Sequence, residues 1–295
     1  MKPRAREVLR GRLASAGASS GLLATALACL ASASCSTAGD ASRPEAPRVV
    51  VPVAVAASMR EPFEQIAAEF METHPHADVR ASYLSSGAAV HQILAGAPFK
   101  LFGSADTAYP ASLQRAGRTV PGSLLVYARG SLALWLPNRL AGEAEIGRGR
   151  EDDTLPSRAA APAHPNAHGG NPIPASVRRI VIASPALAPY GRAASEVLAA
   201  LGASGIRAVH GDDAAQASQI ALAGADAALL PMSLATLSAM RESGAIVPLA
   251  ERMHQPVLHA AVALEGAGEN ATALLRFLAS DHAQAILARY GFRAP

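Results

Sequence analysis

Two hydrophobic patterns alternate along the chain from residue 48 onward. Short runs of Val, Ile, Leu and Ala predict buried strands, and they occupy residues 48–57, 79–83, 101–104, 179–183, 206–209, 227–230, 246–249 and 257–264. The segments between them place apolar residues every three or four positions, which predicts amphipathic helices. The helix expected over residues 88–95, for example, should bury Val90, Ile93 and Leu94. This alternation predicts parallel sheets covered by helices on both faces, and therefore an α/β fold.

Polar residues at the strand ends predict where helices begin. Ser58 and Glu61 fit the capping-box pattern for a helix that ends at His74-Pro75. A side-chain oxygen at such a position accepts a hydrogen bond from an N–H group that has no partner inside the helix. Three later helices have their expected caps at Asp106, Asn270 and Asp281.

Other segments are less regular. The apolar runs 123–128 and 132–136 fit either a hairpin or one long crossing strand. Residues 141–176 are rich in Gly, Pro, Ala, Arg and His without sustained periodicity, which predicts a long surface loop. Residues 234–241 fit a single helix.

The composition is that of a globular protein. Half of the 295 residues are hydrophobic and 17% are charged, which is ordinary for a folded domain. Residues 1–35 contain five Lys or Arg and one Glu, a net charge of +4; since the whole chain carries +3, the remainder carries about −1. The basic balance therefore belongs to the N-terminal segment, and we expect no nucleic acid as a partner.

Residues 1–35 have the layout of a secretory signal, with a basic start, an apolar segment at 21–30 and small residues before Cys35. The apolar segment is too short to predict a membrane span. We expect cleavage, with lipid anchoring through Cys35 as the alternative, followed by a spacer at residues 36–48. Both cysteines, Cys29 and Cys35, lie in this segment, so no disulfide is expected in the mature chain. Either form would be periplasmic or extracytoplasmic.

Four strand-to-helix junctions are candidate anion sites. In an α/β sheet they lie at the carboxyl ends of strands, where ligands bind and where helix N-termini offer free N–H groups. Taken singly, each junction is better explained as a capped helix start than as an anion site. Together they indicate one site to which both halves of the chain contribute. The junctions are Ala57-Ser58, Ser85-Ser86-Gly87, Pro189-Tyr190-Gly191 and Asp212-Asp213-Ala214.

The motifs around these junctions resemble the periplasmic molybdate-binding proteins of bacterial ABC importers. The resemblance covers residues 49 to the end, except 141–176, and its motifs are Val-Ala-Val-Ala-Ala-Ser at 53–58, Ser-Ser-Gly at 85–87, Gln-Ile-Leu-Ala-Gly-Ala-Pro-Phe at 92–99, Ala-Ser-Pro-Ala-Leu-Ala-Pro-Tyr-Gly at 183–191 and Gly-Asp-Asp-Ala at 211–214.

The resemblance implies a type II periplasmic binding protein fold, with two lobes of mostly parallel sheet joined by a hinge. Lobe 1 would comprise residues 49–126 and 255–295, and lobe 2 residues 127–254. The protein would capture molybdate or tungstate between the lobes and deliver it to a membrane permease. It would be a monomer without enzymatic activity, cofactor or metal site, the oxyanion being its only ligand.

The resemblance also implies roles for individual residues. Ser58 and Ser86 would donate side-chain hydroxyls and backbone N–H groups to the oxyanion. Tyr190 and Ala214 would donate backbone N–H groups, and Asp213 would lie beside the ligand. No Arg or Lys is expected at the ligand, because several aimed dipoles stabilise an anion in a dry site.

Three residues depart from the family pattern. Lys100 replaces an acidic residue, and Pro231 stands where one branch has a tyrosine ligand. Asp213 stands where Asn is common, and its carboxylate would repel a dianion but would accept the proton of a singly protonated phosphate. A receptor for phosphate or sulfate and a chain that has lost affinity therefore remain alternatives. A hydrolase using Ser58 or Ser86 is a further one, although neither serine lies in Gly-x-Ser-x-Gly.

Overall fold

The computed structural model describes residues 47–145, 171–203 and 205–295. The predicted signal segment with Cys35, nearly all of the spacer and residues 146–170 of the predicted long loop lie outside these ranges. Within the described ranges, no helix has both the length and the apolar character needed to cross a membrane.

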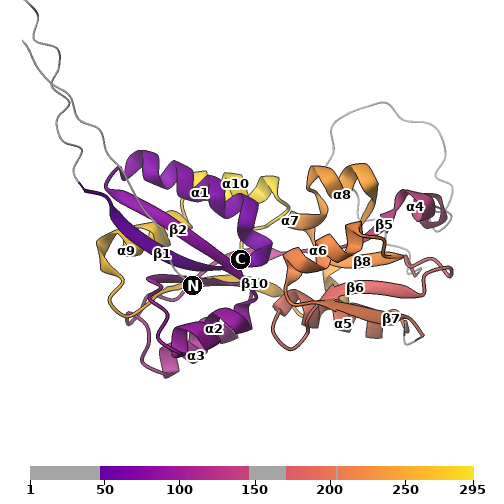
Figure 1. Ribbon diagram of the computed structural model, residues 1–295, viewed down its shortest axis with the longest axis horizontal. Helices are drawn as coiled ribbons and strands as arrows, with labels where there is room; N and C mark the ends of the chain where they lie inside the picture. Colours follow the sequence, from indigo (N-terminus) through magenta and orange to yellow (C-terminus); the bar gives the residue numbers. More distant parts are fainter. Residues whose placement is uncertain (1–46, 146–170, 204) are drawn as a thin grey trace, which may run out of the picture. The chain divides into compact units, whose positions relative to one another are not determined.

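The first sheet has the strand order β2-β1-β3-β10-β4. Helices α1, α9 and α10 pack on one face, and α2 and α3 pack on the other (Figure 1). The strands are β1 (Val49–Ala56), β2 (Ala77–Leu84), β3 (Leu101–Ser104), β4 (Leu125–Gly130) and β10 (Val257–Ala263). The helices are α1 (Arg60–Thr73), α2 (Ser86–Leu94), α3 (Ala108–Arg115), α9 (Gly268–Phe277) and α10 (Asp281–Arg289).

The second sheet has the strand order β7-β6-β8-β5-β9. Helix α5 packs on one face and helices α6, α7 and α8 on the other. The strands are β5 (Leu132–Pro137), β6 (Arg179–Ala183), β7 (Arg207–Gly211), β8 (Ala227–Pro231) and β9 (Gly244–Pro248). The helices are α4 (Asn138–Glu145), α5 (Pro189–Ala200), α6 (Ala214–Leu222), α7 (Met232–Ala235) and α8 (Ser238–Ser243).

The two sheets share one pairing scheme. β1 runs parallel to β2 and β3, and β6 runs parallel to β7 and β8. β10 and β5 are antiparallel to both of their neighbours. These are the strands that follow a passage of the chain from one sheet to the other. The predicted α/β fold with two lobes is confirmed, with sheets that are mixed.

The segment around residue 131 is a crossing strand and not a hairpin. β4 belongs to the first sheet and β5 to the second, and only Ser131 separates them. Residues 128–130 pair with β10 in the first sheet. The chain therefore passes between the sheets at Ser131, whereas the lobe boundary after residue 126 and the lobes as separate rigid bodies stay predictions.

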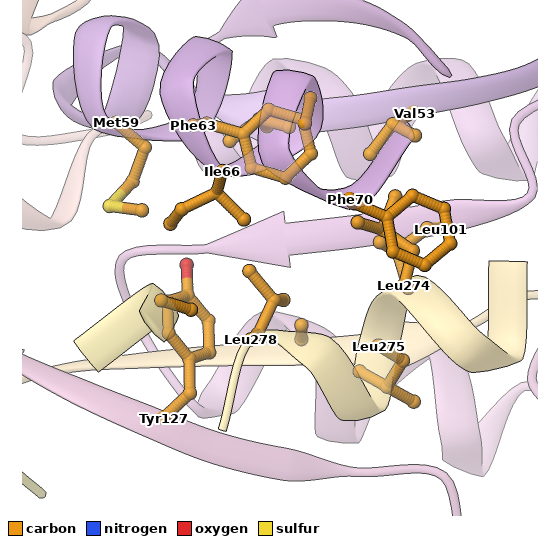
Figure 2. Packing of buried hydrophobic residues seen from close by; sticks show 14 of the residues in the cluster. Val53, Met59, Phe63, Ile66, Phe70, Leu101, Tyr127, Leu274, Leu275 and Leu278 are labelled. Atoms are coloured by element: carbon orange, nitrogen blue, oxygen red, sulfur yellow. The ribbon is translucent and has the colours of Figure 1, made fainter. Parts of the chain in front are cut away.

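Burial explains why the strand predictions succeeded. The inner strands β5 and β8 are buried along their whole length, so each reads as an unbroken apolar run, and β3 is equally buried although it ends in Gly103-Ser104. On the first sheet, Phe63, Ile66 and Phe70 of α1 pack with Leu101 of β3 and Leu274 of α9 (Figure 2).

Several local predictions were wrong where tertiary contacts decide. Leu94 is 52% exposed, because Ala89, Val90 and Ile93 already form the buried face of α2. Residues 234–241 form parts of two helices, since Thr236 ends α7 with its hydroxyl on the Met232 carbonyl. Residues 141–145 of the expected loop lie in α4.

Three of the expected helix caps were also misplaced. Ser280, not Asp281, caps α10 with its side chain. Asn270 lies inside α9, which begins at Gly268. Asp106 accepts the Ala108 N–H of α3 from one position before the N-cap, Thr107.

Candidate functional site

The first sheet contributes two corners at which a serine follows a strand, and we call them the serine corners. At the first, the chain passes from β1 to α1 through a 3-10 turn, Ala57–Met59. The N-cap of α1 is Met59 and makes no side-chain cap bond, so the predicted capping box was wrong. Ser58 is only 2% exposed, and its Oγ has no hydrogen-bond partner among the described residues. A buried hydroxyl without a partner is costly, which is consistent with a role in binding a ligand.

The second serine corner joins β2 to α2. Ser85 is the N-cap of α2, and its Oγ accepts the Ala88 N–H at 3.4 Å. Ser86 is the first helical residue, and its Oγ accepts the Ala105 N–H at 3.2 Å. Since a hydroxyl can accept and donate at once, the Ser86 hydrogen stays available to a ligand.

The second sheet contributes two corners that offer backbone donors, and we call them the backbone corners. Tyr190 is the second residue of α5 and Ala214 the first residue of α6, so their N–H groups have no partner within the helix. Asp213 is the N-cap of α6, and its Oδ1 accepts the Gln216 N–H at 2.9 Å. One carboxylate oxygen of Asp213 therefore has a structural role.

All five predicted site residues line one small cavity of about 10 Å³: Ser58, Ser86, Tyr190, Asp213 and Ala214. The other described residues lining it are Ala, Leu, Ser and Pro, with no Lys or Arg, so Asp213 supplies the one charged group among them. Four helix starts that are distant in the sequence thus meet at a single point. Such ends carry partial positive charge and N–H donors, an arrangement that can stabilise an anion without a basic side chain.

Contacts between elements of the two sheets surround the cavity, and the sequence did not reveal them. The Gly87 N–H donates to the Leu187 carbonyl at 2.9 Å, and the Ser233 hydroxyl donates to the Ser58 carbonyl at 2.7 Å. A Cβ at Gly87 would lie 3.1 Å from the Leu187 oxygen. The glycine of Ser-Ser-Gly was therefore the available signal of a close approach.

An ion pair and a hydrogen-bonded pair of neutral side chains also join elements of the first sheet to elements of the second. Arg192 of α5 forms an ion pair with Asp106, which follows β3, and its guanidinium lies 5.6 Å from the centre of the Tyr109 ring. The Tyr190 hydroxyl lies 3.1 Å from His259 Nε2 on β10. Burial lowers the pKa of His259 to about 3, and burial together with nearby Tyr127 raises the pKa of Tyr190, so both groups are neutral near pH 7.

The cavity has the chemistry of a binding site. A nucleophilic serine needs a neighbouring base, but Ser86 Oγ is bonded to a backbone N–H and Ser58 Oγ has no partner in the described ranges. Across those same ranges, no three His, Cys, Asp or Glu side chains gather in a way that could hold a metal ion. The arrangement offers hydroxyl and N–H donors to an acceptor-rich ligand.

Comparison with known proteins agrees with this geometry. The chain is 31% identical to the molybdate-binding protein ModA of Azotobacter vinelandii over 248 residues, which is 82% of this chain and 89% of that protein. It is also 31% identical to ModA of Rhodobacter capsulatus over 246 residues, covering 81% of this chain and 86% of the relative.

A solved structure and a family profile point the same way. The structure of the Azotobacter vinelandii periplasmic molybdate-binding protein superposes with a TM-score of 0.67 at 28% identity, covering 83% of this chain and 99% of that one. Residues 51–293 match the profile of the bacterial extracellular solute-binding proteins. The matched region contains both sheets and all four corners, and the chain therefore belongs to the bacterial extracellular solute-binding protein family.

Proposed function

We propose that this protein binds molybdate or tungstate between the serine corners and the backbone corners and delivers it to an ABC permease. The observation that carries this proposal is the convergence of Ser58, Ser86, Tyr190 and Ala214 on one small cavity without a basic residue. The names of the two 31% identical relatives supply the identity of the oxyanion.

The donor set suits a tetrahedral oxyanion. Two hydroxyls approach from the first sheet and two N–H groups from the second, so donors lie on opposite sides of the cavity. Hydrogen bonds to a charged group contribute about 1.5 to 3 kcal/mol each in a water-poor site. The partial positive charges of the helix starts add to this stabilisation. No formal countercharge is then needed.

Phosphate is the second candidate, and Asp213 is the residue that favours it. Its carboxylate lines the cavity while only Oδ1 is bonded to Gln216 N–H. A singly protonated phosphate could donate its proton to the remaining oxygen, whereas molybdate and sulfate carry no proton near pH 7 and would be repelled. The capping role of Asp213 turns the carboxylate toward α6, which supports molybdate as the first choice.

We further propose that the protein has no catalytic activity of its own. Ser58 and Ser86 lack a hydrogen-bonded base among the described residues, and His259 is held by Tyr190 and does not line the cavity. Binding followed by release to a permease requires only opening and closing of the lobes. We propose a monomer in the periplasm, free after cleavage of residues 1–35 or anchored through a lipid at Cys35.

Titration calorimetry with molybdate, tungstate, sulfate and phosphate tests the proposal. Molybdate and tungstate are expected to bind at least about 100-fold more tightly than sulfate and phosphate, a difference of about 2.7 kcal/mol. Tighter binding of phosphate than of molybdate would overturn the assignment and support the proton-accepting role of Asp213. Hydrolysis of phosphate or acyl esters that is lost in Ser86→Ala would overturn the binding-protein assignment itself.

A further inference from the structure

Tyr190 lines the cavity, and its side chain reaches a residue that does not line it. Its ring is 3% exposed, and its hydroxyl lies 3.1 Å from Nε2 of His259, which is fully buried on β10 of the first sheet. Tyr190 belongs to the first turn of α5, on the second sheet. One residue therefore combines an N–H group that has no partner within its helix with a hydroxyl that reaches the opposite sheet.

The end of the Tyr190 side chain lies against the crossing strand. Any Cβ at Gly130 would overlap the Tyr190 hydroxyl and would lie 3.3 Å from His259 Nε2. Gly130 is the last residue of β4, directly before the crossing at Ser131. The absence of a side chain at position 130 is thus what allows the hydroxyl to reach the first sheet.

His259 is held firmly from its own side. Its ring contacts Phe292 edge-on with centroids 4.9 Å apart, and Tyr127 at 6.1 Å. The β10–β4 register shifts between His259 and Ala260, and such bulges re-aim side chains next to functional sites. Nδ1 is buried with no partner among the described residues, so Tyr190 supplies the polar contact that this ring makes there.

We infer that His259 is a positioning residue of the oxyanion site, which fixes the Tyr190 N–H relative to Ser58 and Ser86 through the Tyr190 hydroxyl. The inference rests on the proposed function and adds a residue that touches neither the ligand nor the cavity. Ser58 and Ser86 stand on the first sheet and Tyr190 on the second, so their spacing depends on contacts between the two sides. The Tyr190–His259 hydrogen bond is such a contact, and Tyr190 is also the residue whose N–H group would donate to the ligand.

The expected effect is faster release of ligand. Without the bond, the first turn of α5 separates more easily from the first sheet, whereas the ligand still enters the open form at the same rate. A neutral hydrogen bond of this kind corresponds to about a 3- to 10-fold change in dissociation rate. Tyr190→Phe and His259→Leu should each show this change.

Dissociation of radiolabelled molybdate, chased with excess unlabelled molybdate, measures the effect directly. The Tyr190→Phe/His259→Leu double variant is expected to release ligand no faster than either single variant, because all three lack the same bond. His259→Gln, whose amide can reach the tyrosine hydroxyl, should retain slow release. Phe70→Leu is the matched control: it removes packing from the same core of the first sheet, where its ring contacts His74 and Phe277, and should lower the unfolding temperature without changing the dissociation rate.

The outcomes separate this inference from the proposed function. If the wild-type protein binds none of the four oxyanions in calorimetry, both are overturned. If the wild-type protein binds molybdate but Tyr190→Phe and His259→Leu release it at the wild-type rate, only the role of His259 is overturned. Additive effects in the double variant, or equal acceleration in Phe70→Leu, would also overturn it, since either result would indicate general loosening of the core.

Discussion

In the proposed site, the serine corners and the backbone corners would supply the same kind of donor in different ways. On the first sheet, Ser58 and Ser86 line the cavity, and their side-chain hydroxyls would be the donors. On the second sheet, the Tyr190 ring turns away to His259 and the Asp213 carboxylate turns to its own helix, so backbone N–H groups are the donors that remain. Side-chain substitutions can therefore probe the first pair directly, but the second pair only through the backbone or through the contacts that hold it.

This difference has a physical origin. A hydroxyl adds a rotatable donor at a helix start, while a backbone N–H is fixed in direction by the helix that carries it. The backbone corners depend on the orientation of α5 and α6, so contacts that orient these helices are part of the site. Tyr190–His259 and Arg192–Asp106 are such contacts for α5.

The largest expected effect comes from removing a backbone donor. Ala214 is the first residue of α6, and Asp213 before it is extended at φ −140° and ψ −177°, which is compatible with a following proline. Ala214→Pro deletes the N–H and places a methylene where the anion would lie. Molybdate affinity measured by calorimetry should fall by about 100-fold or more.

Asp281→Pro is the matched control for that substitution. Asp281 is the first residue of α10, and Ser280 before it has φ −69° and ψ 155°. The same backbone change at this helix start, which does not line the cavity, should leave affinity unchanged. An equal loss in both variants would mean that helix disruption, and not the missing donor, causes the effect.

Substitution of either serine should weaken binding, but the two variants should differ in their stability. Ser58→Ala and Ser86→Ala are each expected to weaken molybdate binding by about 1 to 3 kcal/mol, the contribution of a hydrogen bond to a charged group. Only Ser86→Ala leaves a buried N–H, that of Ala105, without its acceptor. Its free energy of unfolding without ligand should therefore fall by about 1 to 3 kcal/mol, and that of Ser58→Ala should not.

Calorimetry and denaturant unfolding without ligand measure these two quantities separately. Equal unfolding free energies in the two variants would contradict the assigned role of the Ser86 hydroxyl as acceptor. Wild-type affinity in either variant would remove that serine from the site.

The third test concerns the link between Tyr190 and the first sheet. Burial lowers the pKa of His259 to about 3, whereas the pKa of a histidine in an unfolded chain is about 6.5. Between these two pKa values the unfolded state therefore binds more protons than the folded state. The contribution of neutral His259 to the free energy of unfolding is complete above about pH 6.5 and is lost as the pH falls toward 3. Between pH 7 and 5, His259 should account for about 2 kcal/mol of lost stability.

Denaturant unfolding at a series of pH values checks this prediction. His259→Leu should give a flatter profile than the wild-type protein over that range. His282→Gln serves as the control, because the His282 side chain is 82% exposed and its removal should leave the profile nearly unchanged. Parallel profiles for the wild type and His259→Leu would indicate that the buried ring takes up a proton in the folded state.

The smallest expected effect comes from the ion pair beside the cavity. The Arg192 and Asp106 side chains are 40% and 19% exposed, so water and salt screen their attraction. Arg192→Gln should weaken molybdate binding by about 1 kcal/mol or less, and the loss should shrink at high salt. Arg80→Gln breaks the Arg80–Asp78 pair on β2 instead and should have no effect. A salt-independent loss in Arg192→Gln would point to a role other than its charge.

The sequence by itself determined the elements whose signal is local. Strands β3 and β6 were predicted at the residues where they occur, because strands that are buried over most of their length consist mainly of apolar residues. The four corners were also readable, because strand ends followed by Ser, Asp or Pro mark helix starts. The prediction that Ser58, Ser86, Tyr190, Asp213 and Ala214 form the site rested on the resemblance of these motifs to molybdate-binding proteins.

Only the tertiary structure decided which of these features act together. Ser58 fits a capping box in sequence, yet it lies in a 3-10 turn beside the cavity, and its buried hydroxyl has no partner among the described residues. The apolar runs on either side of Ser131 fit a hairpin as well as a crossing strand, and only the sheet order shows that each run belongs to a different sheet. Gly130, Tyr190 and His259 lie far apart in the chain, and no local pattern reports a contact between them. The spacing of apolar residues indicates which side chains are buried. Which residues these side chains contact is decided only when the two sheets pack together.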